Sequence, residues 1–194
     1  MGKRGPKPKG KVKIKWSANF AYAIGLLTTD GCLSDGRHII MTSKDVEQLK
    51  NFSKGLVVNL KIGVKSNGHG QTASLVQFSD VLFYSFLESI GLLKAKSLTI
   101  GRIMIPNEYF FDFLRGCFDG DGCSYSYWDP RWKSSYMFYV SFASGSQNFI
   151  KWLQREIGKR LKIKSHIGIS KNKVNLYYQL RYSKYGSGVG EKNV

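Results

Sequence analysis

Apolar residues recur at helical spacing in two places along the chain. One run begins after Ser17, a suitable N-cap residue, and ends at Gly31. The other run spans Phe110–Phe118 and ends at Gly122. Each run predicts a helix whose last turn carries an acid directly before the closing glycine.

Shorter segments with alternating polarity lie between and after these helices. They predict strand pairs within 32–41 and 61–79, joined by a helix that Ser43 caps and followed by a helix after Asp80. After Pro106 the order restarts, with strands at 124–127, 136–142, 164–169 and 174–182, and a helix after Ser146. The chain is therefore predicted to be an α+β protein made of a duplicated αββαββ unit.

The predicted organisation has three parts. Residues 1–16 are expected to be a basic flexible arm, because 1–15 carry seven basic residues and no acid. Residues 17–105 form the first repeat and 106–194 the second, which stops before the closing helix that the first repeat has after Asp80. The arm could lie along phosphates or in a minor groove, or it could be a solvated tail.

The helix ends of the two repeats match residue by residue. Asp30-Gly31-Cys32 corresponds to Asp121-Gly122-Cys123, and Gly25 and Gly116 precede them. Because glycine lets another backbone approach closely, the two helices are expected to pack together and bring Asp30 and Asp121 side by side. Such carboxylates at helix C-termini repel each other unless divalent cations neutralise them. The alternative is that each Asp-Gly pair is only a helix-stopping turn.

Charge and cysteine content narrow the function classes. Thirty Lys and Arg against 13 acids give a net charge of +17, which favours a polyanionic partner over a merely soluble basic protein. Three cysteines imply no disulfide framework and favour an intracellular, reducing compartment. No zinc-ligand pattern, signal peptide or long apolar span is present in the sequence.

The alternating strands predict one apolar face and one polar face that could read nucleic-acid bases. Arg and Lys read guanine edges, Gln reads adenine and Ser adapts, although these residues could also be ordinary solvated positions. The candidate contacts are Ser34, Arg37, Gln77, Ser124, Ser126, Arg131, Lys133, Ser141, Gln179 and Arg181. The basic stretch 151–184 should add phosphate contacts. Aromatic residues at 128, 132, 136 and 139 favour either nucleic-acid contact or cross-strand pairing in a long hairpin.

Two segments carry a family resemblance. Gly25–Gly31 (GLLTTDG) and Phe113–Gly122 (FLRGCFDGDG) resemble the paired signature motifs of the LAGLIDADG homing endonucleases. The connector KSLTIGRIMIP and the segment SKDVEQLKNF are similar to that family as well, so the resemblance covers roughly residues 17–184.

The resemblance implies a fold, a site and an activity. Two antiparallel sheets, related by a pseudo-twofold axis, would form a DNA-binding saddle with the motif helices between them. Asp30 and Asp121 would be catalytic metal-binding acids, with the carbonyls of Thr29 and Gly120 as further ligands. Lys94 or Lys96 would be the basic pocket residue that assists charge stabilisation. The metal would be Mg²⁺, with Ca²⁺ or Mn²⁺ able to occupy the same sites.

By the same resemblance, the protein would be a monomeric, intron-encoded endonuclease. It would cut both strands of a double-stranded DNA target of roughly twenty base pairs across the minor groove, leaving 3′ overhangs. An RNA maturase and a DNA-binding regulator that does not cleave stay open as alternatives on the same scaffold.

Overall fold

The computed structural model describes residues 10–66, 70–131, 136–171 and 175–183. Its elements follow the predicted repeated order, with one additional helix after the first αββαββ unit. The first half contains α1 (Ala18–Asp30), β1 (Gly31–Ser34), β2 (His38–Ser43), α2 (Val46–Leu56), β3 (Ile62–Ser66), β4 (Thr72–Ser79) and α3 (Val81–Ser89). The second half contains a short 3₁₀ turn (Asn107–Tyr109), α4 (Phe110–Asp121), β5 (Gly122–Trp128), β6 (Tyr136–Ser144), α5 (Gln147–Leu161), β7 (His166–Lys171) and β8 (Leu176–Ser183).

The chain divides into two compact units that do not coincide with the sequence repeats. Unit 1 comprises Met1–Lys96 and Ile103–Gly120, and unit 2 comprises Ser97–Arg102 and Asp121–Val194. Helix α4 thus belongs to unit 1 up to Gly120, although the sequence places it at the start of the second repeat.

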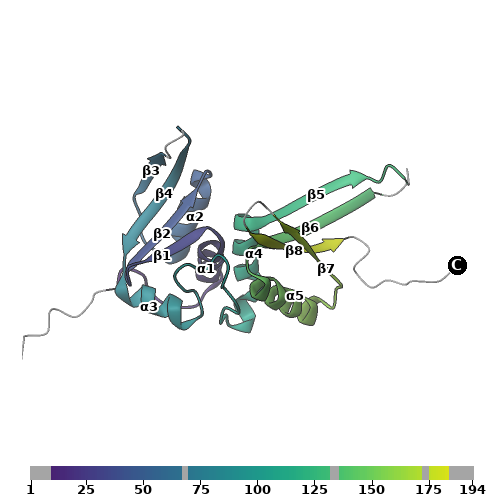
Figure 1. The fold of residues 1–194 in the computed structure, drawn as a ribbon. Coiled ribbons are helices and arrows are strands. Elements are labelled where there is room, and N and C mark those ends of the chain that lie inside the picture. The colour runs from purple at the N-terminus through teal and green to yellow at the C-terminus, as the bar shows by residue number, and fades with distance from the viewer. Residues whose placement is uncertain (1–9, 67–69, 132–135, 172–174, 184–194) are drawn as a thin grey trace, which may run out of the picture. The chain divides into compact units, whose positions relative to one another are not determined.

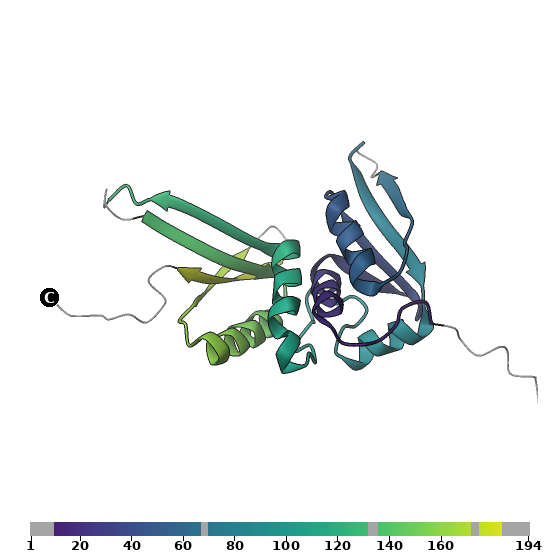
Figure 2. The same ribbon diagram turned by 180° about the vertical axis from the view of Figure 1, so that it is seen from behind.

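Unit 1 contains an antiparallel four-stranded sheet with the order β1-β2-β4-β3. Helices α1 and α2 lie side by side against one face of this sheet (Figure 2, purple and blue). The core between helices and sheet is aliphatic and aromatic, because the strands turn alternate residues towards it. Its fully buried members include Ile24, Leu27, Ile39, Met41, Phe52 and Val76.

Unit 2 repeats this arrangement with the strand order β5-β6-β8-β7. Helix α5 lies against one face of that sheet (Figure 1). The buried residues of this unit include Phe142 and Leu180 from the strands and Ile150 and Leu153 from the helix. Because two separate sheets have the same strand order and each carries a helix between its second and third strands, the predicted α+β tandem repeat is confirmed.

Most predicted helix starts are confirmed, and one is wrong. Ser17 caps α1, with its hydroxyl accepting a hydrogen bond from the Phe20 N–H. For α2 the cap is Asp45, whose carboxylate accepts from the Glu47 N–H at 2.8 Å, and the predicted cap Ser43 instead accepts from the Asp45 N–H at 3.0 Å. Asp and Ser cap equally well, so sequence preference alone did not decide between them.

Helices α1 and α4 pack together in unit 1 through two glycines. A Cβ atom on Gly25 would lie 2.2 Å from the Phe113 carbonyl oxygen, and one on Gly116 would lie 2.1 Å from the Tyr22 carbonyl oxygen. Both distances are far shorter than any real contact, so only glycine allows the two backbones to approach this closely. The predicted contact between the glycine-bearing helices is confirmed.

The basic N-terminal segment is not an independent arm over its described part. Asp80 is buried and its Oδ2 accepts hydrogen bonds from the backbone N–H of Lys11 and Val12, at 2.5 and 2.9 Å. Val12 is buried as well, and the Trp16 ring packs edge-on against Phe20. The expectation for residues 1–16 therefore fails from Lys11 onwards, because the buried Asp80 carboxylate needs the N–H donors that this segment supplies.

Two other expectations concern residues outside the described part of the chain. They are the absence of a closing helix after Tyr182 in the second repeat, which falls on 184–194, and the nucleic-acid contact assigned to Lys133. Within the described ranges, no helix is long and apolar enough to cross a membrane.

Candidate active site and nucleic-acid interface

The C-terminal end of α1 lies against the backbone of α4 within unit 1. Asp30 is the last residue of α1 and is half-buried, and the preceding Thr29 donates its hydroxyl to the Leu26 carbonyl at 2.9 Å. A Cβ atom on Gly120 would lie 2.0 Å from Thr29 Oγ1 and 2.9 Å from Asp30 Oδ2. Any side chain at Gly120 would therefore displace the acid end of α1.

A buried lysine reaches the same helix end. Lys96 is 7% exposed, and its Nζ donates a hydrogen bond to the Thr29 carbonyl oxygen at 3.2 Å. Burying a charged ammonium group is costly unless it is paired and hydrogen-bonded. Its position beside Thr29 therefore indicates either a structural partner for the helix end or a cation held for function.

The structure distinguishes Lys96 from Lys94 as candidate site residues, which the sequence alone could not do. The Lys94 side chain is 63% exposed and forms an ion pair with Asp35 at 3.9 Å. An exposed pair at that distance contributes little to stability, because both groups keep most of their hydration. Of the two candidate lysines, Lys96 is the one that is hydrogen-bonded to a residue beside Asp30.

Asp121, the second predicted acid, is the last residue of α4 and is exposed. It follows Gly120 directly in the chain but belongs to unit 2. Gly120 is the last residue of its segment in unit 1, and its backbone lies beside Thr29 and Asp30.

The predicted donors are of the chemical types that a hard divalent cation takes. Carboxylate oxygens of Asp30 and Asp121 and the carbonyls of Thr29 and Gly120 are the ligand types that Mg²⁺ prefers. No cluster of three or more His, Cys, Asp or Glu side chains occurs among the described residues. Mg²⁺ in nucleotide chemistry needs no such cluster, because one or two carboxylates suffice when water and substrate phosphates complete its shell.

In unit 1, two of the predicted base contacts share the sheet face that the helices leave uncovered. Ser34 pairs with His38, and Gln77 pairs with Ile40, whereas the intervening positions Leu33 and Ile39 are buried. Arg37 lies in the turn between β1 and β2 and donates from Nε to His38 Nε2 at 3.4 Å. The other ring nitrogen of His38 is 2.8 Å from Ser79 Oγ, so the imidazole is fixed at both ends.

In unit 2, three predicted base contacts form one chain of hydrogen bonds. Arg181 Nε donates to Gln179 Oε1 at 2.9 Å, and Gln179 Nε2 donates to Ser141 Oγ at 3.2 Å. Ser141 in turn donates to the Cys123 carbonyl oxygen at 3.4 Å. This chain fixes the guanidinium and amide groups before any ligand arrives, which reduces the entropy lost on binding.

In the same sheet of unit 2, the strand register places Ser124 and Ser126 on the face opposite to Ser141 and Arg181. Ser124 pairs with Val140, whereas its neighbour Cys123 pairs with Ser141 and shares the face of Arg181. The Tyr136 hydroxyl donates to Ser126 Oγ at 2.6 Å on that same other face. The expectation of one polar face holding all the serines is therefore wrong, because successive side chains alternate between faces.

Arg131 is already paired with an acid. Its Nε and Nη2 donate to Asp129 at 3.1 and 2.9 Å, and its backbone N–H donates to Oδ1 at 2.9 Å. These hydrogen bonds hold the pKa of the Asp129 carboxyl below its usual value. A phosphate or base that used this guanidinium would have to compete with the carboxylate of Asp129.

The aromatic residues of the β5–β6 hairpin pair with one another across the strands. Tyr139 stacks on Tyr125 with ring centroids 5.1 Å apart and on Tyr127 at 6.1 Å, and Trp128 meets Tyr136 at 5.1 Å. Of the two interpretations offered for these residues, cross-strand pairing is the one that the structure contains. Tyr125, Tyr127, Trp128 and Tyr136 keep more than a third of their surface exposed.

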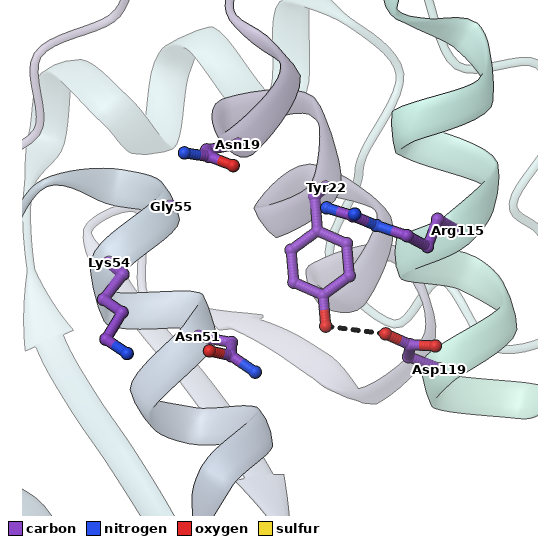
Figure 3. Close-up of a pocket in the computed structure, with 7 residues that line it drawn as sticks. All are labelled: Asn19, Tyr22, Asn51, Lys54, Gly55, Arg115 and Asp119. Carbon is purple, nitrogen blue, oxygen red and sulfur yellow. Dashed lines mark hydrogen bonds between the residues drawn. The ribbon is translucent and has the colours of Figure 1, made fainter.

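Sequence reasoning missed a polar pocket of about 350 Å³ in unit 1 (Figure 3). The Tyr22 hydroxyl donates to Asp119 Oδ2 at 2.7 Å, and the Arg115 guanidinium lies 4.5 Å from the centre of the Tyr22 ring. Burial, with the bond to Asp119, raises the pKa of Tyr22. In the sequence, the signal was that the charged residues Arg115 and Asp119 flank a glycine of FLRGCFDGDG. That Tyr22 of α1 is their partner could not be deduced from spacing.

Comparison with known proteins identifies the fold. No protein-family profile matches this sequence, and no curated protein is detectably similar to it. Among solved structures, the homing endonuclease I-DmoI in complex with DNA and Mn has a TM-score of 0.53 at 15% identity, covering 85% of this chain and 89% of that one. The homing endonuclease I-WcaI bound to its DNA recognition sequence has a TM-score of 0.53 at 14% identity, covering 92% and 84%.

The same fold occurs in a second kind of protein. The N-terminal LAGLIDADG domain of DUF199/WhiA has a TM-score of 0.54 at 16% identity, covering 91% of this chain and 85% of that domain. Full-length WhiA from Thermatoga maritima is also similar, and the chain spans about half of its length (54%). The fold of this protein is therefore that of the LAGLIDADG homing endonucleases, shared at low sequence identity.

Proposed function

We propose that this protein is a site-specific, divalent-metal-dependent DNA endonuclease that hydrolyses one phosphodiester in each strand of a long duplex. The observation that carries the proposal is the convergence of Asp30, the Thr29 carbonyl and the buried Lys96 ammonium group at one end of α1. The fold shared with DNA-bound homing endonucleases supports it. The net charge of +17 supports a polyanionic partner.

In this proposal, Asp30 and Asp121 hold the metal, with the carbonyls of Thr29 and Gly120 as further ligands. A bound Mg²⁺, or Mn²⁺ or Ca²⁺ in its place, would supply charge neutralisation and an activated water for phosphodiester hydrolysis. The backbone of Gly120, which lies against Asp30 within unit 1, continues directly into Asp121.

Lys96 has a separate role in the proposal. Its ammonium group is held at the Thr29 carbonyl in a largely buried position. A cation that is already in place when negative charge develops on the phosphate stabilises that charge without reorganising solvent. Lys94, which is exposed and paired with Asp35, would contribute only to the general positive field.

The exposed sheet faces would read the duplex. Arg181 and Gln179 are hydrogen-bonded to each other, so their remaining donors are oriented for base edges or phosphates. In the other sheet, Ser34 and Gln77 occupy the corresponding uncovered face. Cleavage across the minor groove with 3′ overhangs, a target of roughly twenty base pairs and a monomeric, intron-encoded enzyme belong to the same proposal.

The first experiment is a selection for cleaved sites in a randomised duplex library in the presence of Mg²⁺, with EDTA as the control. The selected site, placed in a plasmid, is then treated with wild type, Asp30→Asn and Asp121→Asn. We expect both variants to lose double-strand cutting while retaining affinity for the duplex measured in Ca²⁺. Asp45→Asn is the matched control, because Asn caps a helix as well as Asp does and the change of charge is the same.

A second pair of variants tests the lysine. Lys96→Met should reduce the cleavage rate by about a hundredfold or more, as loss of one preorganised charge-stabilising group does. Lys94→Met should leave the rate nearly unchanged.

If the aspartate variants lost binding instead of cutting, the acids would be structural and the proposal would fail.

A DNA-binding protein that does not cleave is the second candidate. It is favoured by the equal likeness to the LAGLIDADG domain of WhiA, whose name describes no endonuclease. Specific duplex binding without cutting in Mg²⁺ or Mn²⁺ would select this candidate. Binding to a structured intron RNA with no selected duplex would select the maturase alternative instead.

A further inference from the structure

Unit 2 contains a pocket of about 630 Å³ on the side of its sheet that α5 covers. It lies between the N-terminal half of α5, the segment 101–102 and Ile167 of β7. Its lining residues include three cations and no acid: Arg102, Lys151 and Arg155. The amide side chains of Asn148 and Gln154 and the buried Trp152 complete most of the wall.

The sequence gathers these residues by helix periodicity. Asn148, Lys151 and Arg155 are spaced at i, i+3 and i+7 along α5, so they fall on one face of the helix. Arg102 comes from the segment that precedes α4 in the chain but belongs to unit 2. The basic residues of α5 therefore line a cationic pocket only once the segment 101–102 has folded against this helix.

The three cations lack a close ion-pair partner in the part of the chain that the structure describes. Among the residues that the structure describes, none of Arg102, Lys151 and Arg155 has a carboxylate within 4.0 Å. The one acid of α5, Glu156, is hydrogen-bonded to Arg160, and Arg102 contributes only a weaker electrostatic attraction to it. Three like charges around one concavity repel one another, and a bound anion removes that repulsion.

The pocket is on the opposite side of the sheet from the base-reading residues. Ile167 pairs with Leu180, which is fully buried on the face that α5 covers. The neighbouring pair, His166 and Arg181, points to the uncovered face. A duplex lying on the uncovered face therefore cannot reach Lys151 and Arg155 through the sheet.

We propose that this pocket binds the phosphate groups of a second ligand, separate from the duplex on the sheet face. Guanidinium groups bind phosphate oxygens in a bidentate manner, and the Lys151 ammonium and the Asn148 amide add further donors. The volume is within the range of small-molecule sites and exceeds what one phosphate needs. The ligand is therefore a compound with several phosphates or the backbone of a second nucleic-acid segment.

The test compares two double variants of the full chain. Lys151→Ala/Arg155→Ala removes two pocket cations from exposed helix positions, where alanine is the best helix former. Lys159→Ala/Lys164→Ala removes the same charge from exposed positions of unit 2 that do not line the pocket. The probes are pyrophosphate, followed by calorimetry at fixed ionic strength, and a labelled single-stranded oligonucleotide, followed by fluorescence anisotropy.

We expect the pocket variant to lose at least about tenfold in affinity for one of the probes, and the control variant less than about twofold. For the oligonucleotide, the slope of log affinity against log salt should also fall by about 0.7 for each pocket cation removed. Binding of pyrophosphate identifies a small phosphorylated ligand, and binding of the oligonucleotide alone identifies a nucleic-acid backbone.

Three results would overturn the proposal: no binding of either probe to wild type, equal losses in the two variants, or no loss in the pocket variant. Because no step of this test requires cleavage or a target site, its outcome is independent of the proposed endonuclease activity.

Discussion

The contact between α1 and α4 gives the sharpest prediction about stability. In Gly25→Ala, the new methyl group would lie 2.2 Å from the Phe113 carbonyl oxygen and 2.9 Å from the Gly116 Cα. Ordinary contact begins at about 3.4 Å, so the two helices would have to separate by about 1 Å. Both obstacles are backbone atoms, and no rotamer change can relieve the clash.

The expected cost follows from two opposing effects. Overpacking a rigid contact costs up to about 3 kcal/mol, and replacing Gly by Ala inside a helix returns about 1 kcal/mol. The variant should therefore lose about 2 kcal/mol of unfolding free energy. For a chain of this size, that corresponds to a decrease in Tm of about 4–8 °C.

The assay is thermal and urea unfolding followed by far-UV circular dichroism. Gly101→Ala is the matched control, because a Cβ atom there meets no atom within 4 Å, and it should be neutral or slightly stabilising. Gly25→Ala combined with Gly116→Ala should cost less than the sum of the single changes, since both methyl groups open the same contact. A Gly25→Ala protein as stable as the Gly101→Ala protein would refute the close approach of the two helices.

Three further predictions concern polar contacts. Tyr22→Phe should cost about 1 kcal/mol of unfolding free energy at neutral pH, because it removes the hydrogen bond to Asp119. The pKa of Tyr22 is raised above its ordinary 10.0, so wild type should also lose stability above about pH 10, where the tyrosine of the unfolded chain ionises first. The variant should lack this part of the loss. Asp80→Ala should cost at least about 2 kcal/mol, since it removes the cap of α3 and the acceptor for the N-terminal segment. Glu156→Gln should cost about 0.5 kcal/mol of unfolding free energy near neutral pH and almost nothing in acid. The hydrogen bond to Arg160 lowers the pKa of Glu156, so the stabilisation that it gives disappears as the carboxylate is protonated.

Denaturant midpoints measured across pH check all three. Parallel stability curves of wild type and Tyr22→Phe above pH 10 would contradict the raised pKa of Tyr22. For the capping acid, Asp80→Asn is the intermediate control, because asparagine keeps one side-chain oxygen. An Asp80→Ala protein no less stable than Asp80→Asn would show that this remaining acceptor contributes nothing. A Glu156→Gln effect of the same size at neutral and acidic pH would mean that charge plays no part.

The elements and their repeated order were predictable from the sequence. Helical and strand periods depend on neighbouring residues alone, so Phe20 to Leu27 predicted α1, and the Asp-Gly-Cys pairs revealed the duplication. The contact between Gly25 and Gly116 was also predictable, because a glycine at matching positions of two repeated helices indicates close approach.

Other features were decided only by the tertiary structure. Lys94 and Lys96 are equivalent in sequence, and only the path of the connector buries one of them at the Thr29 carbonyl. Strand register, which depends on partners far along the chain, placed Ser124 on the helix-covered face and Ser141 on the other.

The same distinction explains the N-terminal segment and the cationic pocket. Composition favoured a solvated arm, but the N–H groups at Lys11 and Val12 meet the buried Asp80, a residue about seventy positions away. Lys151 and Arg155 were only part of a basic stretch until the segment with Arg102 folded beside them. Local pattern determines which elements form, whereas long-range contacts determine which side chains meet, because a sequence period contains no information about a distant partner.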